Sequence, residues 1–119
     1  MSRIFIPALA AAALVMAAPQ SASAHARLVS STPAAGASIA APRTVSLTFS
    51  ERTVAAFSKL EIEDGRGDRT TLRTTVSRDG RTLTAPVGRT LAAGAYTVHW
   101  GIASADGHRM TGSYAFSVR

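Results

Sequence analysis

The chain has 119 residues, no cysteine and a formal net charge of +6. This length fits a single domain behind a leader, and the absence of cysteine excludes disulfides and thiolate metal sites. The basic side chains are mostly scattered singly, without a basic run or an interleaved aromatic platform, which argues against a nucleic-acid-binding protein. Stability must therefore come from one apolar core of ordinary size.

The first residues have the composition of a cleaved secretory signal peptide. One cation is followed by an apolar run over residues 4–18 and by the small-residue stretch A-S-A over residues 22–24. The run of about 15 residues is shorter than the roughly 20 that a transmembrane helix needs. Removal of residues 1–24 leaves a mature domain, residues 25–119, that begins with His25. A cut after Ala26 satisfies the same small-residue rule.

Short segments in which apolar and polar residues alternate recur along the mature chain. In residues 44–50, for example, Val45, Leu47 and Phe49 share one face of an extended segment. A period of two is typical of strands with one buried face. The chain is therefore predicted to be all-β, a sandwich or barrel of about seven strands. The expected strands are residues 26–31, 44–50, 57–63, 71–76, 82–87, 95–104 and 113–118.

Turn residues separate these segments. Residues 64–68 and 77–82 each contain an acidic residue and a glycine typical of tight turns, and residues 33–42, with two prolines and a glycine, predict a loop. One turn of helix is expected near residues 52–57. Pro86 predicts an edge or an end of its strand, because proline has no N–H for the sheet.

The side chains able to bind a metal ion come from both ends of the mature chain. If His25 is the mature amino terminus, its α-amine and its Nδ1 can close a chelate ring on one metal ion. Asp106 and His108 flank Gly107, which lets the backbone bend so that both side chains project in similar directions. An amine, two imidazoles and a carboxylate suit Cu(II), whereas zinc accepts histidine and carboxylate but favours a tetrahedral site.

The order of several motifs resembles the CopC family of periplasmic copper-binding proteins. These motifs are the export signal, a mature start of the form H-A-x-L, S-x-P-A-x-G, LTFSE, and YTVHWGIASADGHRMTGSYAFSV. The resemblance implies a single Greek-key β-sandwich, immunoglobulin-like or cupredoxin-like, that holds one Cu(II) ion in the periplasm. It matches the family's metal ligands to His25, Asp106 and His108, and it makes Glu51 a secondary candidate.

The resemblance stops at the methionine-rich Cu(I) site of some family members. Met110 is the only methionine of the mature chain, so a separate Cu(I) site is not expected. We expect Met110 to pack or to form a rim contact, and His99 to lie at the surface on the face opposite Trp100. Trp100, Tyr114 and Phe116 are expected in the core.

Three hypotheses for function follow. The favoured one is a copper-binding protein without enzyme activity, a monomer that sequesters copper or delivers it to an inner-membrane transporter or another exported copper protein, for resistance or homeostasis. The second is a small histidine-brace copper oxidase, which the small domain and the extra carboxylate of Asp106 argue against. The third is a metal-free exported module for adhesion or assembly, in which residues 106–108 form only a hairpin turn.

Overall fold

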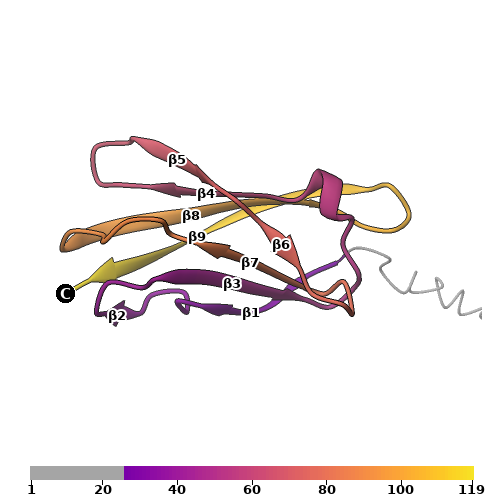
Figure 1. Ribbon diagram of the computed structural model, residues 1–119, viewed down its shortest axis with the longest axis horizontal. Helices are drawn as coiled ribbons and strands as arrows, with labels where there is room; N and C mark the ends of the chain where they lie inside the picture. Colours follow the sequence, from indigo (N-terminus) through magenta and orange to yellow (C-terminus); the bar gives the residue numbers. More distant parts are fainter. Residues whose placement is uncertain (1–25) are drawn as a thin grey trace, which may run out of the picture.

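The computed structural model describes residues 26–119, so the leader predicted over residues 1–24 and His25 lie outside the described residues. The described residues form a sandwich of two β-sheets, with the 3-10 turn η1 (Ala55–Phe57) as its one helical element (Figure 1). Nothing within residues 26–119 forms a helix that is long and apolar enough to cross a membrane. The prediction of an all-β sandwich is confirmed.

The two sheets contain strands from all parts of the described chain. Neighbouring strands are antiparallel, except that β2 runs parallel to the end of β9. The four-stranded sheet has the order β1 (Leu28–Thr32), β3 (Thr44–Phe49), β7 (Thr82–Pro86), β6 (Thr75–Val76). The five-stranded sheet has the order β2 (Ser38–Ile39), β9 (Arg109–Val118), β8 (Gly94–Ala103), β4 (Lys59–Glu63), β5 (Arg69–Leu72).

The described residues contain nine strands where about seven were expected. The segment 71–76, predicted as one strand, is divided because β5 ends at Leu72 in the five-stranded sheet and β6 begins at Thr75 in the four-stranded sheet. The second additional strand, β2, lies inside the loop predicted over residues 33–42. Both β2 and β6 have two residues, too few for a period of two to be visible in the sequence.

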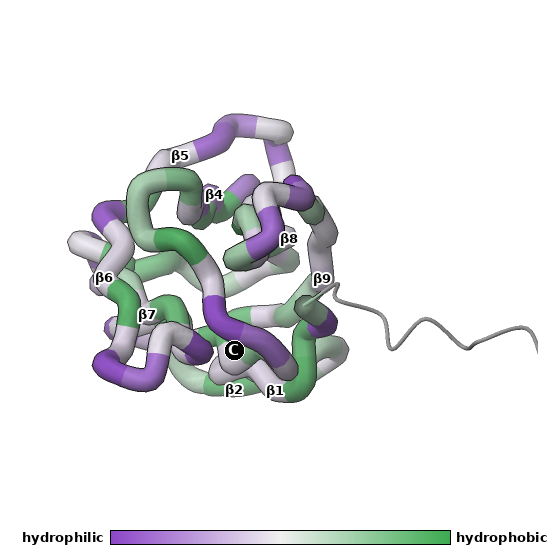
Figure 2. Tube along the Cα trace, turned by 90° about the vertical axis from the view of Figure 1, so that its right-hand side faces the viewer, coloured by the Kyte–Doolittle hydropathy of each residue, from purple (hydrophilic) through white to green (hydrophobic). Residues whose placement is uncertain are grey.

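Alternate residues of the two sheets fill the space between them. Figure 2, which views the strands end-on, shows β4 and β8 on one side of this interior and β7 and β1 on the other. Burying a Leu or Phe side chain contributes about 1.5–3 kcal/mol, so this layer is the main source of stability. The fully buried large side chains include Phe49, Phe116, Leu47, Leu60, Ile62, Leu83, Ile102, Val45 and Val98.

Trp100 packs against the core beside a glycine of the neighbouring strand. Its ring meets Phe49 edge-on, with ring centroids 5.2 Å apart. Gly112 lies opposite Trp100 in the register of β8 and β9, and a Cβ atom built there would lie 2.3 Å from Cζ2 of the indole. Only glycine permits this approach. The predicted core positions of Tyr114 and Phe116 are confirmed, whereas Trp100 is partly buried against the core.

Candidate metal centre

The D-G-H segment forms the turn of the long hairpin between β8 and β9. The N–H of Ser104 donates to the carbonyl of His108 at 2.9 Å, and the N–H of Gly107 donates to the carbonyl of Ser104, also at 2.9 Å. Gly107 has φ +87°, a conformation that residues with a side chain rarely adopt. The turn therefore depends on this glycine, and it brings Asp106 and His108 together at the tip of the hairpin.

Both oxygens of the Asp106 carboxylate accept hydrogen bonds within the turn. Oδ1 accepts a hydrogen bond from the hydroxyl of Ser104 and another, at 3.2 Å, from the backbone N–H of His108. Oδ2 lies 2.8 Å from Nδ1 of the His108 ring. The side chain of Ser104 is buried, while the side chains of Asp106 and His108 are 34% and 61% exposed, so the pair can be reached by an ion from solvent.

These contacts keep Asp106 ionised. The hydroxyl of Ser104, followed by the ring and the backbone N–H of His108, holds the pKa of Asp106 well below its usual range. Hydrogen bonds donated to a carboxylate favour its charged form. At any ordinary pH the tip of the hairpin therefore presents a carboxylate beside an imidazole, which are ligand types that divalent transition metals accept.

The start of β1 lies at the same end of the sandwich as this turn (Figure 1). The N–H of Arg27 donates to the hydroxyl of Ser50, and the N–H of Ser50 donates to the carbonyl of Arg27, each at 2.8 Å. Three residues further on, Thr53 forms an isolated bridge with Ser104. Glu51, which is exposed, lies on the short segment that joins these two contacts. Residues 50–53 therefore connect the start of the described chain to the D-G-H turn.

The described residues supply only part of a metal site. Asp106 and His108 are brought together, Glu51 lies at the same end, and His25 lies outside the described residues. Within residues 26–119, no three His, Cys, Asp or Glu side chains are grouped closely enough to hold a metal ion. Any complete site built on the hairpin pair therefore needs further donors.

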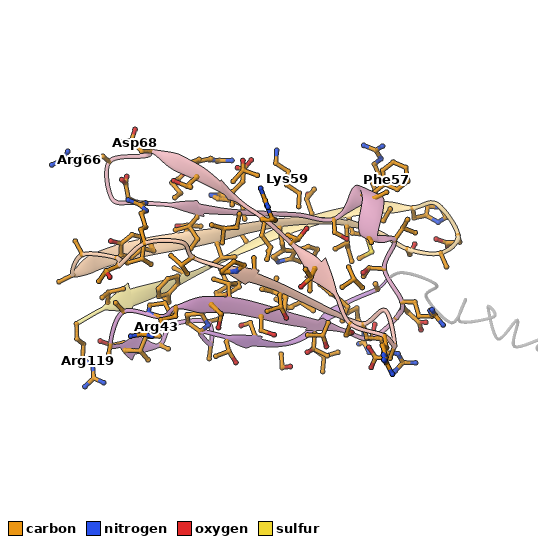
Figure 3. All side chains as sticks on the ribbon, viewed as in Figure 1. Arg43, Phe57, Lys59, Arg66, Asp68 and Arg119 are labelled. Atoms are coloured by element: carbon orange, nitrogen blue, oxygen red, sulfur yellow. The ribbon has the colours of Figure 1, made fainter. Side chains whose placement is uncertain are left out.

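An exposed aromatic side chain stands beside the hairpin. Phe57 of η1 is 54% exposed, and the guanidinium carbon of Arg109 lies 5.1 Å from its ring centroid (Figure 3). The 3-10 turn is attached to the hairpin, because the N–H of Val54 donates to the carbonyl of Ala103 at 2.8 Å. Phe57 and Arg109 therefore lie at the same end of the molecule as the D-G-H turn.

A hollow of about 400 Å³ lies on the outer face of the five-stranded sheet, between β4 and β9. Its charged lining is internally paired, because Glu61 lies 2.7 Å from Nζ of Lys59 and 3.5 Å from Nη1 of Arg69. His99 was expected at the surface. It is on the outer face as predicted but only 26% exposed, with Nε2 3.5 Å from Glu63.

Residues 28–119 match the model of the CopC domain. The chain belongs to the CopC family. It is 39% identical to Copper resistance protein C of Pseudomonas syringae pv. tomato, in an alignment that covers 97% of this chain and 94% of that protein.

Solved structures agree with this assignment. CopC from Methylosinus trichosporium OB3b superposes with a TM-score of 0.71 at 33% identity, covering 79% of this chain and 93% of that one. PcoC from Escherichia coli, described as a methionine rich copper resistance protein, superposes with a TM-score of 0.69 at 30% identity, covering 80% and 99%. The CopC resemblance in the sequence is confirmed.

In this CopC-family chain, one side chain beside the turn behaves as expected and one makes an unexpected contact. Met110 is partly buried and packs against the hydrophobic core, as expected. The contact of Ser104 with Asp106 was not predicted, although Ser104 was part of the matched motif. The available signal was the S-x-D spacing, which also gives a side-chain contact between Ser77 and Asp79 in the turn before β7.

Proposed function

We propose that this protein is a periplasmic copper-binding protein that holds one Cu(II) ion at the hairpin end of its sandwich. The proposed ligands are His25, Asp106 and His108, with Glu51 as a secondary candidate. The observation that carries the proposal is the Asp106–His108 pair, held side by side at the end where β1 begins. The names of the matched relatives, which are copper resistance proteins, support copper as the bound ion.

The hairpin pair places a carboxylate oxygen next to an imidazole nitrogen, at the distance of an ordinary hydrogen bond. Oδ2 of Asp106 and Nδ1 of His108 are 2.8 Å apart. Binding through both atoms requires the loss of the Nδ1 proton, because metal ligands bind in their deprotonated form.

The amino-terminal part of the proposed site rests on the sequence and on where the described chain begins. Ala26 is fully buried, and Arg27 is hydrogen-bonded to Ser50 at the hairpin end. In this proposal, His25, the residue directly before Ala26, supplies its donors at that end. Removal of residues 1–24 supplies a free α-amine at His25, which adds the nitrogen donors that the hairpin pair lacks.

The proposed role is to bind and transfer an ion, without a reaction step. An exposed site on a small monomer can sequester copper or pass it to an inner-membrane transporter or another exported copper protein. The outward position of Asp106 and His108 supports such transfer, because a receiving protein can reach the ion directly.

The test is a Cu(II) titration followed by electron paramagnetic resonance. Two proteins are compared, one that starts at His25 and one that retains Ala24. We expect only the first to give a tight, nitrogen-rich tetragonal signal with one equivalent of copper. Equal binding by both would show that the terminal amine is not a ligand.

Histidine variants provide a matched pair for the same titration. His108→Ala is expected to weaken Cu(II) binding strongly, and His99→Ala, which alters a histidine on the outer sheet face, is expected to leave it unchanged. If His108→Ala and an Asp106→Ala variant both bound copper as tightly as the unmodified protein, the proposed site would be wrong.

A further inference from the structure

Ser104 is a buried polar residue that lies two residues before Asp106, at the start of the exposed D-G-H turn. It is 2% exposed, and its hydroxyl donates to Oδ1 of Asp106. A buried hydroxyl that donates to a carboxylate makes a charge-assisted hydrogen bond, which is stronger than a bond between neutral groups. The contact therefore joins the residue that directly follows β8 to a side chain on the surface of the turn.

The two oxygens of Asp106 have different partners because of this contact. Oδ1 is turned toward the protein, where it accepts from Ser104 and from the backbone of His108. Oδ2 is turned toward the imidazole of His108. An aspartate side chain has several staggered rotamers available to it. The hydroxyl of Ser104 favours the rotamer in which Oδ1 faces the protein and Oδ2 faces the imidazole, and it acts together with the two contacts from His108.

We propose that Ser104 is a positioning residue for copper binding, which fixes the rotamer of Asp106 so that Oδ2 is ready to bind the ion. This inference rests on the proposed function. Removing a residue that hydrogen-bonds to a metal ligand and orients it typically lowers the metal affinity by about 10–100-fold. We expect Ser104→Ala to weaken Cu(II) binding by a factor in this range.

The hydroxyl of Ser104 also lies 3.3 Å from the carbonyl of His108, but the turn is closed by backbone hydrogen bonds as well. Its two backbone hydrogen bonds, from Ser104 to His108 and from Gly107 to Ser104, remain available to alanine. The bridge between Ser104 and Thr53 is also made by backbone atoms. Ser104→Ala therefore removes the donor to Asp106 and the longer contact with the carbonyl of His108, and it leaves the backbone hydrogen bonds of the turn in place.

Thr53 provides the matched control. It is the other buried polar residue of the described chain, and it lies next to Ser104 across the bridge. Its hydroxyl donates to the carbonyl of Gly80 at 3.1 Å instead of to Asp106. Thr53→Val removes a buried hydroxyl at the same end of the sandwich while preserving side-chain shape, and it is expected to leave copper binding unchanged.

The experiment measures two quantities on the mature protein and its Ser104→Ala and Thr53→Val variants. The first is Cu(II) affinity, by competition with a chelator. The second needs no metal: three-bond NMR couplings report whether the χ1 angle of Asp106 in the copper-free protein holds one rotamer. We expect Ser104→Ala to lower the affinity about 10–100-fold and to average χ1, and Thr53→Val to do neither.

The possible failures can be told apart. If His108→Ala abolishes tight binding while Ser104→Ala changes neither affinity nor χ1, the proposed function stands and the role of Ser104 is wrong. If Thr53→Val weakens binding as much as Ser104→Ala, the effect comes from general loosening of the turn, which also overturns the inference. If His108→Ala and Asp106→Ala bind copper normally, the proposed function itself fails.

Discussion

Replacing Gly112 with alanine tests the packing of the hairpin that carries the proposed site. A Cβ atom at this position would lie 2.3 Å from Cζ2, 2.5 Å from Cε2 and 2.9 Å from Nε1 of Trp100. Real side chains do not tolerate such distances, so the indole must move. The movement costs its edge-on contact with Phe49, which is made at a centroid distance of 5.2 Å.

The expected loss of stability follows from this overpacking. Adding a methyl group to a packed core costs about 1–3 kcal/mol, and an aromatic pair contributes about 0.5–1.5 kcal/mol beyond its buried area. A destabilisation of about 2 kcal/mol lowers the Tm of a domain of this size by about 8–16 °C. The assay is thermal unfolding followed by circular dichroism.

Tryptophan fluorescence reports the same change locally. Trp100 is the only tryptophan of the protein, so its emission is observed without background. We expect Gly112→Ala to shift the emission to longer wavelength, because the displaced indole becomes more exposed to water. Adding Trp100→Leu should reduce the cost of the alanine, since the smaller side chain leaves room for the new methyl group.

The neighbouring glycine is the control. A Cβ at Gly101 would meet Thr111 Cγ2 at 3.8 Å and Lys59 Cβ at 4.0 Å, which are ordinary contacts. Gly101→Ala should therefore leave Tm unchanged or raise it slightly. An unchanged Tm and emission for Gly112→Ala, or an equal loss for Gly101→Ala, would refute the packing argument.

Three further predictions concern the core, a turn and the hairpin tip. Leu47→Ala empties a fully buried position and should cost about 2–5 kcal/mol in denaturant unfolding. The pKa of Asp79 is lowered in the folded protein, chiefly by the hydrogen bond from the hydroxyl of Ser77. The charged Asp79 therefore stabilises the fold fully at a pH above the pKa of an ordinary carboxyl group, and this stabilisation is lost as the pH falls. Asp79→Asn should consequently make the decrease of Tm in acid less steep. Gly107→Ala forces alanine into φ +87°, a strain of about 1–2 kcal/mol, and should weaken Cu(II) binding severalfold in a chelator competition. The control is Gly67→Ala, which imposes the same strain at φ +88° in the β4–β5 turn and should leave Cu(II) binding unchanged.

The candidate site was predictable only where its residues are neighbours in the sequence. Asp106, Gly107 and His108 form a recognisable local motif, and the turn places both side chains together as expected. The role of the serine behind them was missed, because the S-x-D spacing does not show that Ser104 is buried or that its hydroxyl faces Oδ1. The metal-binding roles of all four candidates stay predictions: His25, Glu51, Asp106 and His108.

The sequence by itself determined the all-β class, most strand positions and the position of the D-G-H turn. Each of these depends on local alternation, turn residues or a short spacing, and such features are set by neighbouring residues along the chain. It also placed a helical turn within residues 52–57, where η1 covers Ala55–Phe57.

Only the tertiary structure decided how the segments are partnered. The crossing from β5 to β6 between the two sheets, the two-residue strand β2 and the packing of Trp100 over Gly112 all depend on contacts between distant residues. The proximity of β1 to the D-G-H turn likewise results from the link through residues 50–53. Pairing and packing are selected by the complementarity of whole sheets, and a period of two carries no information about which strand lies next to which.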